Sequence, residues 1–446
     1  RGKTWTSIVS NLPKRGSVYD IAEDHQDENL LFVGTEFGVF FTYNSGKEWK
    51  QLKNGLPTVA VRDIEIQERE NDLVLATFGR SFYVLDNYSS LRQLKNKMNA
   101  KAHIFPIKKS LMYIDSRPLG NRGKGSQGES YFTAKNPPLG AVIKYFFNDT
   151  LKTQKQIRQA LEKKKIKSKE DIEYPTLQQL KLEDKEEKPY LLFTIYDSEG
   201  NEIRKMIESP KLGLNELVWN FRLTPQTNIS LKTSQPGRYS EARNGPLALP
   251  GKYFISMHKV VNGKSTLMVQ KTPFDCSWLN DLSTPTENKE ELLAFQVKVD
   301  RLRKAVDAFG EVMDKDKERL KFIKAAIKSY PNLDITLLET ISRLEDTING
   351  INILLYGDPS LSSRDIEQKE SIASKVGIII WNMWRSRSNP TMTNEKLYQI
   401  ASSDFEKLIT EIQNLDNSIK EIETYLEKNE VPFTPGRGLI LNWKKE

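Results

Sequence analysis

The chain has 446 residues, 38% of them hydrophobic, which is enough for about three domains with cores of their own. Its 67 basic and 59 acidic residues give a net charge of +8, but they are spread along the chain, so no nucleic-acid partner is expected. Cys276 is the single cysteine and there are three histidines, which excludes an intrachain disulfide framework and argues against a metal or other cofactor. No membrane span is predicted, because the longest apolar run, around residues 376–380, is too short to cross a bilayer.

A segment near the start of the chain occurs twice, at an offset of 43 to 44 residues. Repeats of about 40 to 50 residues with alternating apolar positions are typical of β-propeller blades, four-stranded sheets that cannot bury both faces alone. We therefore expect two blades over residues 1–87. Since two blades cannot close a ring, the remaining blades are expected upstream on the same polypeptide or on another subunit. The matching segments are 2–5 and 46–49, 11–13 and 55–57, and 18–21 and 61–64.

The residues between the two predicted blades, 42–49, form a turn motif. They resemble the Asp-box, or BNR repeat, of sialidases and sortilin-type receptors, with Asn44 standing where the family usually has aspartate. A short polar side chain at Asn44 closes the turn through local hydrogen bonds, Gly46 supplies a positive φ, and Trp49 packs under the turn. The resemblance implies that Asn44, Gly46, Glu48 and Trp49 are structural and not catalytic.

Two charged residues in the predicted blades are candidate ligand contacts. Glu36 follows the predicted strand 30–35, and Arg80 follows the predicted strand 72–77. Arg80 either points toward the central channel of the ring or pairs with a neighbouring blade.

A linker over residues 88–130 and a second domain over residues 131–276 are expected next. The linker includes a glycine-rich stretch, 119–128, that lacks the spacing of a phosphate loop. The alternating strands of the second domain, with a core aromatic at Trp219, resemble the immunoglobulin-like domain of the flagellar hook capping family, which implies a spacer. Residues 151–189 are predicted to be a helical insertion, either a solvated helix or a docking element for an acidic partner.

From residue 283 to residue 430 the apolar period changes to about 3.5, which predicts a bundle of about four long helices, one of them over residues 365–387. Residues 284–287 match a capping box that opens the first helix, and residues 431–446 are predicted to be a C-terminal tail. Trp381 and Trp384 belong either to the bundle core or to an exposed pair that grips a partner or a sugar.

The order of these parts resembles the C-terminal part of large bacterial BNR-repeat proteins, which are sortilin-like and often labelled as glycosyl hydrolases. The resemblance implies a multidomain β plus α chain with the end of an Asp-box β-propeller, an Ig-like β-sandwich with a helical insertion, and a C-terminal long-helix bundle. It also implies a secreted, periplasmic or cell-surface bacterial protein with partners in an outer-membrane or cell-surface complex.

The expected function is non-catalytic binding and scaffolding through protein–protein or glycan contacts. One alternative is part of a glycoside hydrolase, which needs two carboxylates roughly 5 to 10 Å apart. Asp20, Glu36, Asp63 and Asp86 are the candidates, but Asp20 and Asp63 occupy equivalent repeat positions, as structural residues would, and related glycosidases take their acid and base from other blades. The other alternative is a sortilin-like receptor that binds a peptide as an added strand. No catalytic residue, cofactor or metal ligand is assigned in this chain.

Overall fold

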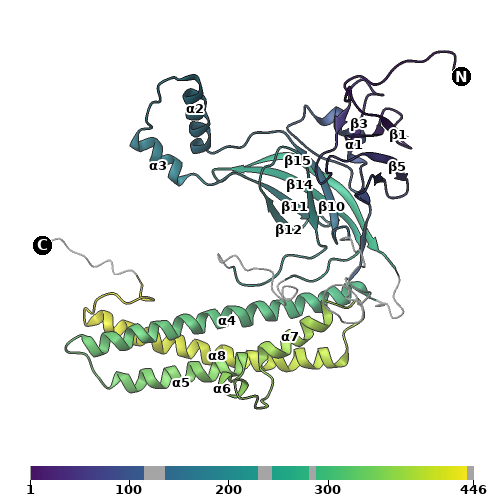
Figure 1. Cartoon of the computed structure of the whole chain (residues 1–446). Helices are drawn as coiled ribbons and strands as arrows, with labels where there is room; N and C mark the ends of the chain where they lie inside the picture. Colours follow the sequence, from purple (N-terminus) through teal and green to yellow (C-terminus); the bar gives the residue numbers. More distant parts are fainter. Residues whose placement is uncertain (1, 115–135, 230–243, 281–287, 439–446) are drawn as a thin grey trace. The chain divides into compact units, whose positions relative to one another are not determined.

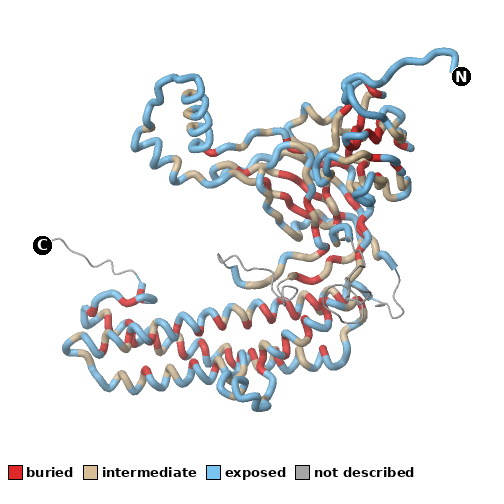
Figure 2. Tube along the Cα trace, in the orientation of Figure 1, coloured by how far each residue is buried: buried red, intermediate tan, exposed pale blue. Residues whose placement is uncertain are grey.

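The computed structural model describes residues 2–114, 136–229, 244–280 and 288–438, and these ranges contain a mixture of β and α structure, as expected (Figure 1). Four sheets and eight helices lie in them. The chain divides into two compact units, Arg1–Asn220 with Pro250–Trp278, and Phe221–Leu249 with Leu279–Glu446. The first unit holds the sheets and the second holds the long helices. In each unit the buried positions line the inner sides of strands or helices (Figure 2).

Two antiparallel sheets form the N-terminal part of the first unit. The strands are β1 (Val18–Glu23), β2 (Leu31–Thr35), β3 (Gly38–Thr42), β4 (Lys50–Gln51), β5 (Val61–Gln67), β6 (Asp72–Thr77) and β7 (Phe82–Leu85). The first sheet has the order β1-β2-β3-β4, and the second has the order β5-β6-β7. Both sheets carry a shift in register at the same place, between Val18 and Asp20 in β1 and between Val61 and Asp63 in β5. The sequence repeat is therefore also a repeat of strand pairing and of its bulge.

These two sheets share one apolar core. Phe32 and Phe41 of the first sheet lie in the same buried cluster as Leu73 and Leu75 of the second. Fully burying side chains of this size stabilises a fold by about 1.5–3 kcal/mol each, so face-to-face contact is a major source of stability for both sheets. On the opposite face of the first sheet, Leu12 and Trp49 belong to a separate buried cluster.

The segment that follows the second sheet is more regular than the expected linker over residues 88–130. It contains α1 (Ser90–Lys97), β8 (Ala102–Ile104) and β9 (Ser110–Met112). These strands have three residues each and gain their regularity from partners far along the chain, which local sequence patterns do not reveal. The glycine-rich stretch 119–128 lies outside the described residues.

Two further sheets complete the first unit. The strands are β10 (Ala141–Phe147), β11 (Tyr190–Tyr196), β12 (Glu202–Glu208), β13 (Gly213–Trp219), β14 (Gly251–Val261) and β15 (Lys264–Trp278). One sheet has the order β13-β10-β8, and the other has the order β12-β11-β14-β15-β9, in which β9 is parallel to β15. Aromatic rings connect the two sheets: the ring centroids are 5.0 Å apart for Trp219 and Tyr253, and 4.9 Å apart for Tyr145 and Phe193. Trp219 is thus a core aromatic, as its sequence context predicts.

Between β10 and β11 the chain forms two helices, α2 (Gln154–Ser168) and α3 (Leu177–Lys185). Each begins with a capping box, in which Thr153 or Thr176 accepts a hydrogen bond from the backbone amide three residues later. Arg158 of α2 joins the helices through an ion pair with Glu183, with an N–O distance of 2.7 Å. No residue of either helix is buried.

The second unit is built on α4 (Lys289–Ser329), α5 (Leu337–Tyr356), α7 (Ile372–Met383) and α8 (Met392–Lys428), with the short α6 (Pro359–Ser362) between α5 and α7. The four longer helices share one apolar core. Ile341, Ile348 and Leu355 contribute to it from α5, and Leu408 and Leu415 from α8. These residues recur at intervals of seven, so the expected period of about 3.5 corresponds to the inner faces of the helices.

The helix boundaries differ from the sequence expectation in two places. The predicted capping box at residues 284–287 lies outside the described residues, and the side chain of Asn288 caps α4 instead by accepting a hydrogen bond from the Glu291 amide at 3.0 Å. The helix expected over residues 365–387 is shorter, because α7 begins only at Ile372, where Ser371 is the N-cap.

Candidate functional site

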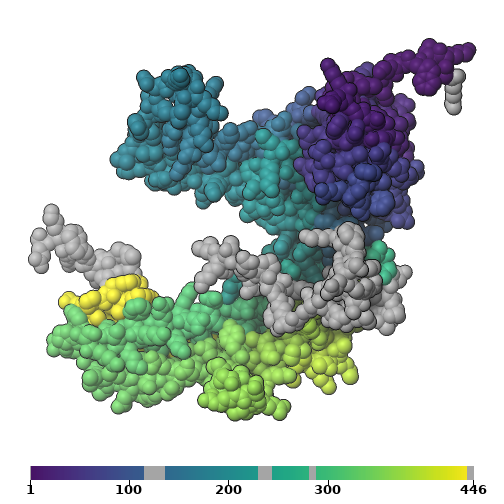
Figure 3. Space-filling model, viewed as in Figure 1, coloured from purple at the N-terminus to yellow at the C-terminus, as the bar shows by residue number. Residues whose placement is uncertain are grey.

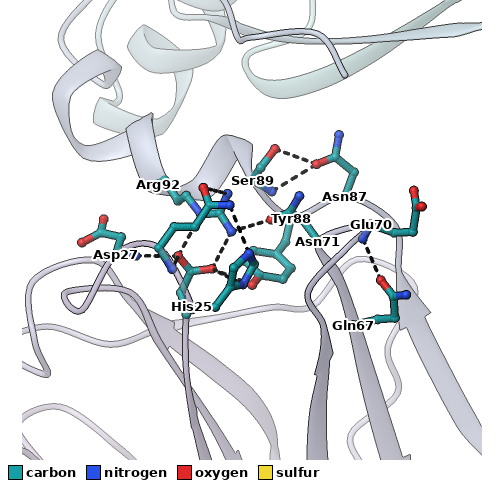
Figure 4. A network of polar contacts seen from close by, with 11 residues as sticks. His25, Asp27, Gln67, Glu70, Asn71, Asn87, Tyr88, Ser89 and Arg92 are labelled. Atoms are coloured by element: carbon teal, nitrogen blue, oxygen red, sulfur yellow. Dashed lines mark hydrogen bonds and ion pairs between the residues drawn. The ribbon is translucent and has the colours of Figure 1, made fainter. Parts of the chain in front are cut away.

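A buried polar network lies where the first two sheets meet α1. Asp24 is buried, and its carboxylate accepts hydrogen bonds from Arg92 Nε at 2.8 Å, Arg92 Nη2 at 2.7 Å and Tyr88 Oη at 2.6 Å. The backbone amides of Gln26 and Asp27 donate to the same carboxylate. Figure 4 shows Arg92 and Tyr88 at the centre of this network, with Asn71 beside the guanidinium group.

The electrostatics of this network indicate a structural role. Burial alone would raise the pKa of Asp24, but the hydrogen bonds from Arg92 and Tyr88 and the guanidinium charge outweigh it and hold the pKa below its usual range. Burial, together with the hydrogen bond to Asp24, raises the pKa of Tyr88. The carboxylate is therefore ionised and fully bonded, which leaves it no capacity to act as an acid or a base.

A cleft with different chemistry lies between the second sheet and strands β9, β10 and β13. Its volume is about 360 Å³, and Asp72, Asp86, Lys144 and Glu216 are among the residues that line it. Lys144 Nζ donates to the backbone carbonyls of Asp86 at 2.7 Å and of Asn87 at 2.6 Å. The Asp72 carboxylate accepts a hydrogen bond from the Asn87 amide at 2.8 Å. The Asp72 carboxylate and the Lys144 ammonium group are thus held by hydrogen bonds at one concave surface, which Asp86 and Glu216 also line.

Two groups in this cleft have shifted pKa values. Partial burial, and then the charge of Asp72, raises the pKa of Asp86, although the charge of Lys144 opposes that rise. Burial lowers the pKa of Lys144, while the charges of Glu216 and Asp86 act in the opposite direction. Shifted acids and bases in a cleft are a common property of functional sites, so this cleft is a candidate site.

A second concavity, of about 470 Å³, is lined by a larger number of apolar residues. Leu52, Leu56, Tyr83 and Leu214 contribute to its wall, and Lys144 borders it as well as the polar cleft. Such a lining suits an apolar group better than a charged one.

The residues that resemble an Asp-box lie in one turn between β3 and β4. Asn44 Oδ1 accepts hydrogen bonds from Thr42 Oγ1 at 2.7 Å and from the Glu48 amide at 3.0 Å. Gly46 has a φ of +83°. Trp49 is buried, and its Nε1 donates to the Ile8 carbonyl at 2.7 Å. Each of these contacts serves the turn and its packing.

Glu36 and Arg80 lie in equivalent hairpin turns of the two sheets, and both are exposed. The Glu36 amide donates to the Ser17 carbonyl at 3.1 Å, which fixes the backbone of that turn. Neither residue is among those that line the two cavities.

Trp381 of α7 and Trp384, the C-cap residue of that helix, do not form an exposed pair. Trp381 is 51% exposed, and the Arg385 guanidinium stacks over its ring at 3.7 Å from the centroid. Trp384 is only 2% exposed, and its Nε1 donates to the Asn244 carbonyl at 2.8 Å. The core interpretation therefore holds for Trp384, and Trp381 remains as a single surface aromatic.

The four carboxylates considered for glycoside hydrolysis are dispersed. Asp20 accepts a hydrogen bond from the Ile64 amide at 2.8 Å and so ties the first sheet to the second. Asp63 is exposed on β5, and Glu36 is exposed in the turn between β2 and β3. Of the four carboxylates only Asp86 lines the polar cleft. Its neighbours Asp72 and Lys144 were not among the predicted site residues. A lysine in the middle of the apolar strand of residues 141–147 was the sequence signal that could have indicated them.

Within the described ranges, no group of three or more His, Cys, Asp or Glu side chains is arranged to hold a metal ion. No described helix is long and apolar enough to cross a membrane. No protein-family model and no curated protein matches this chain.

Proposed function

We propose that this chain is a non-catalytic binding and scaffolding region of a secreted, periplasmic or cell-surface bacterial BNR-repeat protein. In this proposal the first two sheets are blades at the end of an Asp-box β-propeller, the next two sheets are an Ig-like spacer, and α4 to α8 are a helical bundle. The repeated bulge in β1 and β5 and the turn around Asn44 support the propeller assignment.

The main support for a binding role is the surface of the helical hairpin formed by α2 and α3. It exposes large apolar side chains on both helices, and neither helix buries a residue of its own. Figure 3 shows the pair as a separate blue lobe. Helices of this length are marginal in water without tertiary packing. The exposed apolar residues of the two helices and their connection are Ile157, Leu161, Ile166, Ile172, Tyr174, Leu177, Leu180 and Leu182.

The charge of the hairpin indicates the chemistry of its partner. Helix α2 carries six basic residues and one acidic residue. A protein surface with apolar pockets and an acidic rim would complement it. We therefore propose that the hairpin docks to an acidic protein partner in an outer-membrane or cell-surface complex.

The double substitution Leu161→Asp with Leu177→Asp tests this role. Native mass spectrometry of the protein isolated from its source cells should show a complex heavier than the same polypeptide measured after denaturation, and the double variant should lose the partner. The control is Gln159→Asp with Gln178→Asp, which makes the same charge change at exposed polar positions of the same helices and should keep the partner. A complex of unchanged mass in the leucine variant would contradict the proposal.

Glycoside hydrolysis is a second candidate function, and the polar cleft favours it. A carboxylic acid with a raised pKa beside a second carboxylate is the arrangement that such hydrolysis uses, and Asp86 beside Asp72 has this character. If the cleft hydrolyses glycosides, Asp86→Asn should lower kcat on a panel of aryl glycosides by at least about 1,000-fold. Absence of turnover by the unmodified chain would reject this candidate for the cleft.

A further inference from the structure

The contact between the first two sheets gives a direct view of how one repeat packs on the next. The face of the first sheet that carries Phe32, Val39 and Phe41 is covered by the second sheet. A polar bond accompanies this apolar contact, because Asp20 of β1 accepts from the Ile64 amide of β5 at 2.8 Å.

The strand pairing of the second sheet repeats that of the first, position by position. In the first sheet, Gly34 of β2 lies between Asp20 of β1 and Val39 of β3. Phe32 of β2 lies opposite Phe41 of β3. In the second sheet, Ala76 of β6 lies between Asp63 of β5 and Phe82 of β7. Val74 of β6 lies opposite Val84 of β7. Since side chains alternate between the two faces of a strand, the equivalence fixes the face as well as the position. The residues that correspond to Asp20, Phe32, Val39 and Phe41 are Asp63, Val74, Phe82 and Val84.

Equivalent residues differ sharply in exposure. Val39 is 0% exposed and Phe41 is 5% exposed, whereas Phe82 and Val84 are 70% and 55% exposed. Asp63 is also exposed, and no described residue donates a hydrogen bond to its carboxylate. The second sheet therefore presents, uncovered, the face that corresponds to the covered face of the first sheet, with the exposed Glu65 at the position where the first sheet has Ala22. Exposed aromatic and aliphatic side chains that adjoin on one face are typical of an interaction site.

We propose that the face of the second sheet formed by Asp63, Glu65, Val74, Ala76, Phe82 and Val84 is the docking surface for a further antiparallel sheet of the same repeat type. The strand of that sheet that corresponds to β5 donates a backbone N–H group to the Asp63 carboxylate, as Ile64 of β5 does to Asp20. The inference rests on the proposed propeller end and adds to it the surface and the atoms that join the next blade.

One difference between the two faces constrains the docking geometry. A Cβ atom at Gly34 would lie 2.7 Å from the Val61 carbonyl oxygen, so β5 approaches the first sheet where glycine leaves room. Ala76 places a methyl group at the equivalent point of the second sheet. The incoming strand must therefore lie farther from β6 than β5 lies from β2.

The docking sheet is expected outside these 446 residues, and a second copy of them is a poor candidate. If a second copy docked in the same way as the second sheet packs on the first, it would offer the opposite face of its own first sheet, but Val33 and Phe40 on that face are already buried with Leu12 and Trp49. A second copy would therefore meet a face whose apolar residues are largely covered.

Cysteine labelling at position 82 tests the proposal. Burial raises the pKa of the Cys276 thiol to about 12, and Cys276 is buried, so a maleimide near pH 7 reacts with an introduced exposed cysteine. Phe82→Cys should label rapidly in the isolated 446-residue chain. In the protein isolated from its source under native conditions it should label at least about tenfold more slowly, because exposure controls reactivity.

Ser198→Cys, in the exposed turn between β11 and β12, is the matched control and should label at equal rates in both preparations. Equal rates for Phe82→Cys as well would overturn the proposal. Photo-crosslinking from position 82 then identifies the occupant by mass spectrometry. A linked β-strand segment from outside this chain supports the proposal, whereas links to residues 18–42 of a second copy, with a mass that rises with concentration, overturn the assignment of the occupant.

Substitution of the two equivalent aspartates gives a second, independent readout. Asp20→Ala should lower the unfolding temperature of the isolated chain, because the Ile64 amide loses its acceptor. Asp63→Ala should leave that temperature unchanged and should speed the labelling of Phe82→Cys in the native assembly. Loss of the helical hairpin's partner would not alter either result, so this inference and the proposed hairpin function can fail separately.

Discussion

Asp24 shows how one side chain can hold two sheets and a helix together. Its carboxylate receives a bidentate guanidinium, a phenol and two backbone amides, so the cost of burying its charge is offset by bonds to every oxygen lone pair. Breaking one partner of a buried ion pair leaves the other charge without compensation. The contribution of this residue should therefore be large and dependent on pH.

We expect Asp24→Asn to lower the free energy of unfolding of the first unit by about 3 kcal/mol at pH 7. The bonds from Arg92 and Tyr88 hold the pKa of Asp24 below its usual range, so its stabilisation is present at neutral pH and is lost as the pH falls through that lowered pKa. Urea unfolding at a series of pH values from 7 to 2 should show the two proteins converging in acid. A difference in unfolding free energy between the two proteins that stays constant with pH would contradict the role of the ionised carboxylate.

A smaller effect on stability is expected at the turn around Asn44. Asn44→Ala removes the acceptor for Thr42 and Glu48 and should cost about 1–2 kcal/mol. Asn44→Asp keeps an acceptor oxygen at the same place, so its stability should stay within about 0.5 kcal/mol of that of the natural chain. Chemical denaturation measures both. A destabilisation by aspartate as large as that by alanine would show that the amide NH₂ group matters to the turn.

Residues whose partners are close in sequence were the ones that could be predicted. The bonds of Asn44 join residues at most four positions apart, so the turn chemistry is visible in the order of the amino acids. Asp24 finds Tyr88 and Arg92 more than sixty positions later, and Lys144 finds the backbone of Asp86 and Asn87 across two sheets. Local patterns carry no signal for such pairs.

At the scale of elements, helices α4 and α5 approach each other closely at a glycine. The Tyr356 hydroxyl lies within 3.4 Å of the Val306 carbonyl, and a Cβ atom at Gly310 would overlap the Tyr356 side chain. The glycine in the middle of α4 thus has a packing reason, which outweighs its low helix propensity.

We expect Gly310→Ala to destabilise the second unit by about 1–3 kcal/mol, because the added methyl group forces Tyr356 from its site. Gly350→Ala on α5 is the matched control. A Cβ atom there meets nothing within 4 Å, so the better helix propensity of alanine should stabilise the unit by up to about 1 kcal/mol. Thermal unfolding, followed by the helical circular dichroism signal, measures the stability of both variants. Equal changes in stability of the same sign would contradict the packing argument.

Elements with strong periodicity were more predictable than those without it. The seven-residue spacing in α5 and α8 is enough by itself to indicate the buried face of each helix. In contrast, β8 and β9 have three residues each and lie in a segment that was expected to be a linker. They are ordered by pairing with β10 and β15, which no local pattern encodes.

At the scale of the whole molecule, each of the two compact units has its own buried core. Units with separate cores usually unfold as separate cooperative transitions. Differential scanning calorimetry should therefore resolve two transitions. Asp24→Asn should move only one of them and Gly310→Ala only the other, whereas a single transition that responds to both substitutions would show that the units unfold together.

The parallel pairing of β9 with β15 has a consequence for synthesis on the ribosome. Cys276 of β15 is opposite Ser110 of β9, about 166 residues earlier. At translation rates of about 5–20 residues per second, β9 waits roughly 10 to 30 s before its partner exists. The polar cleft, which Ser110 and Leu111 help to line, is therefore completed late, after the first two sheets have been made.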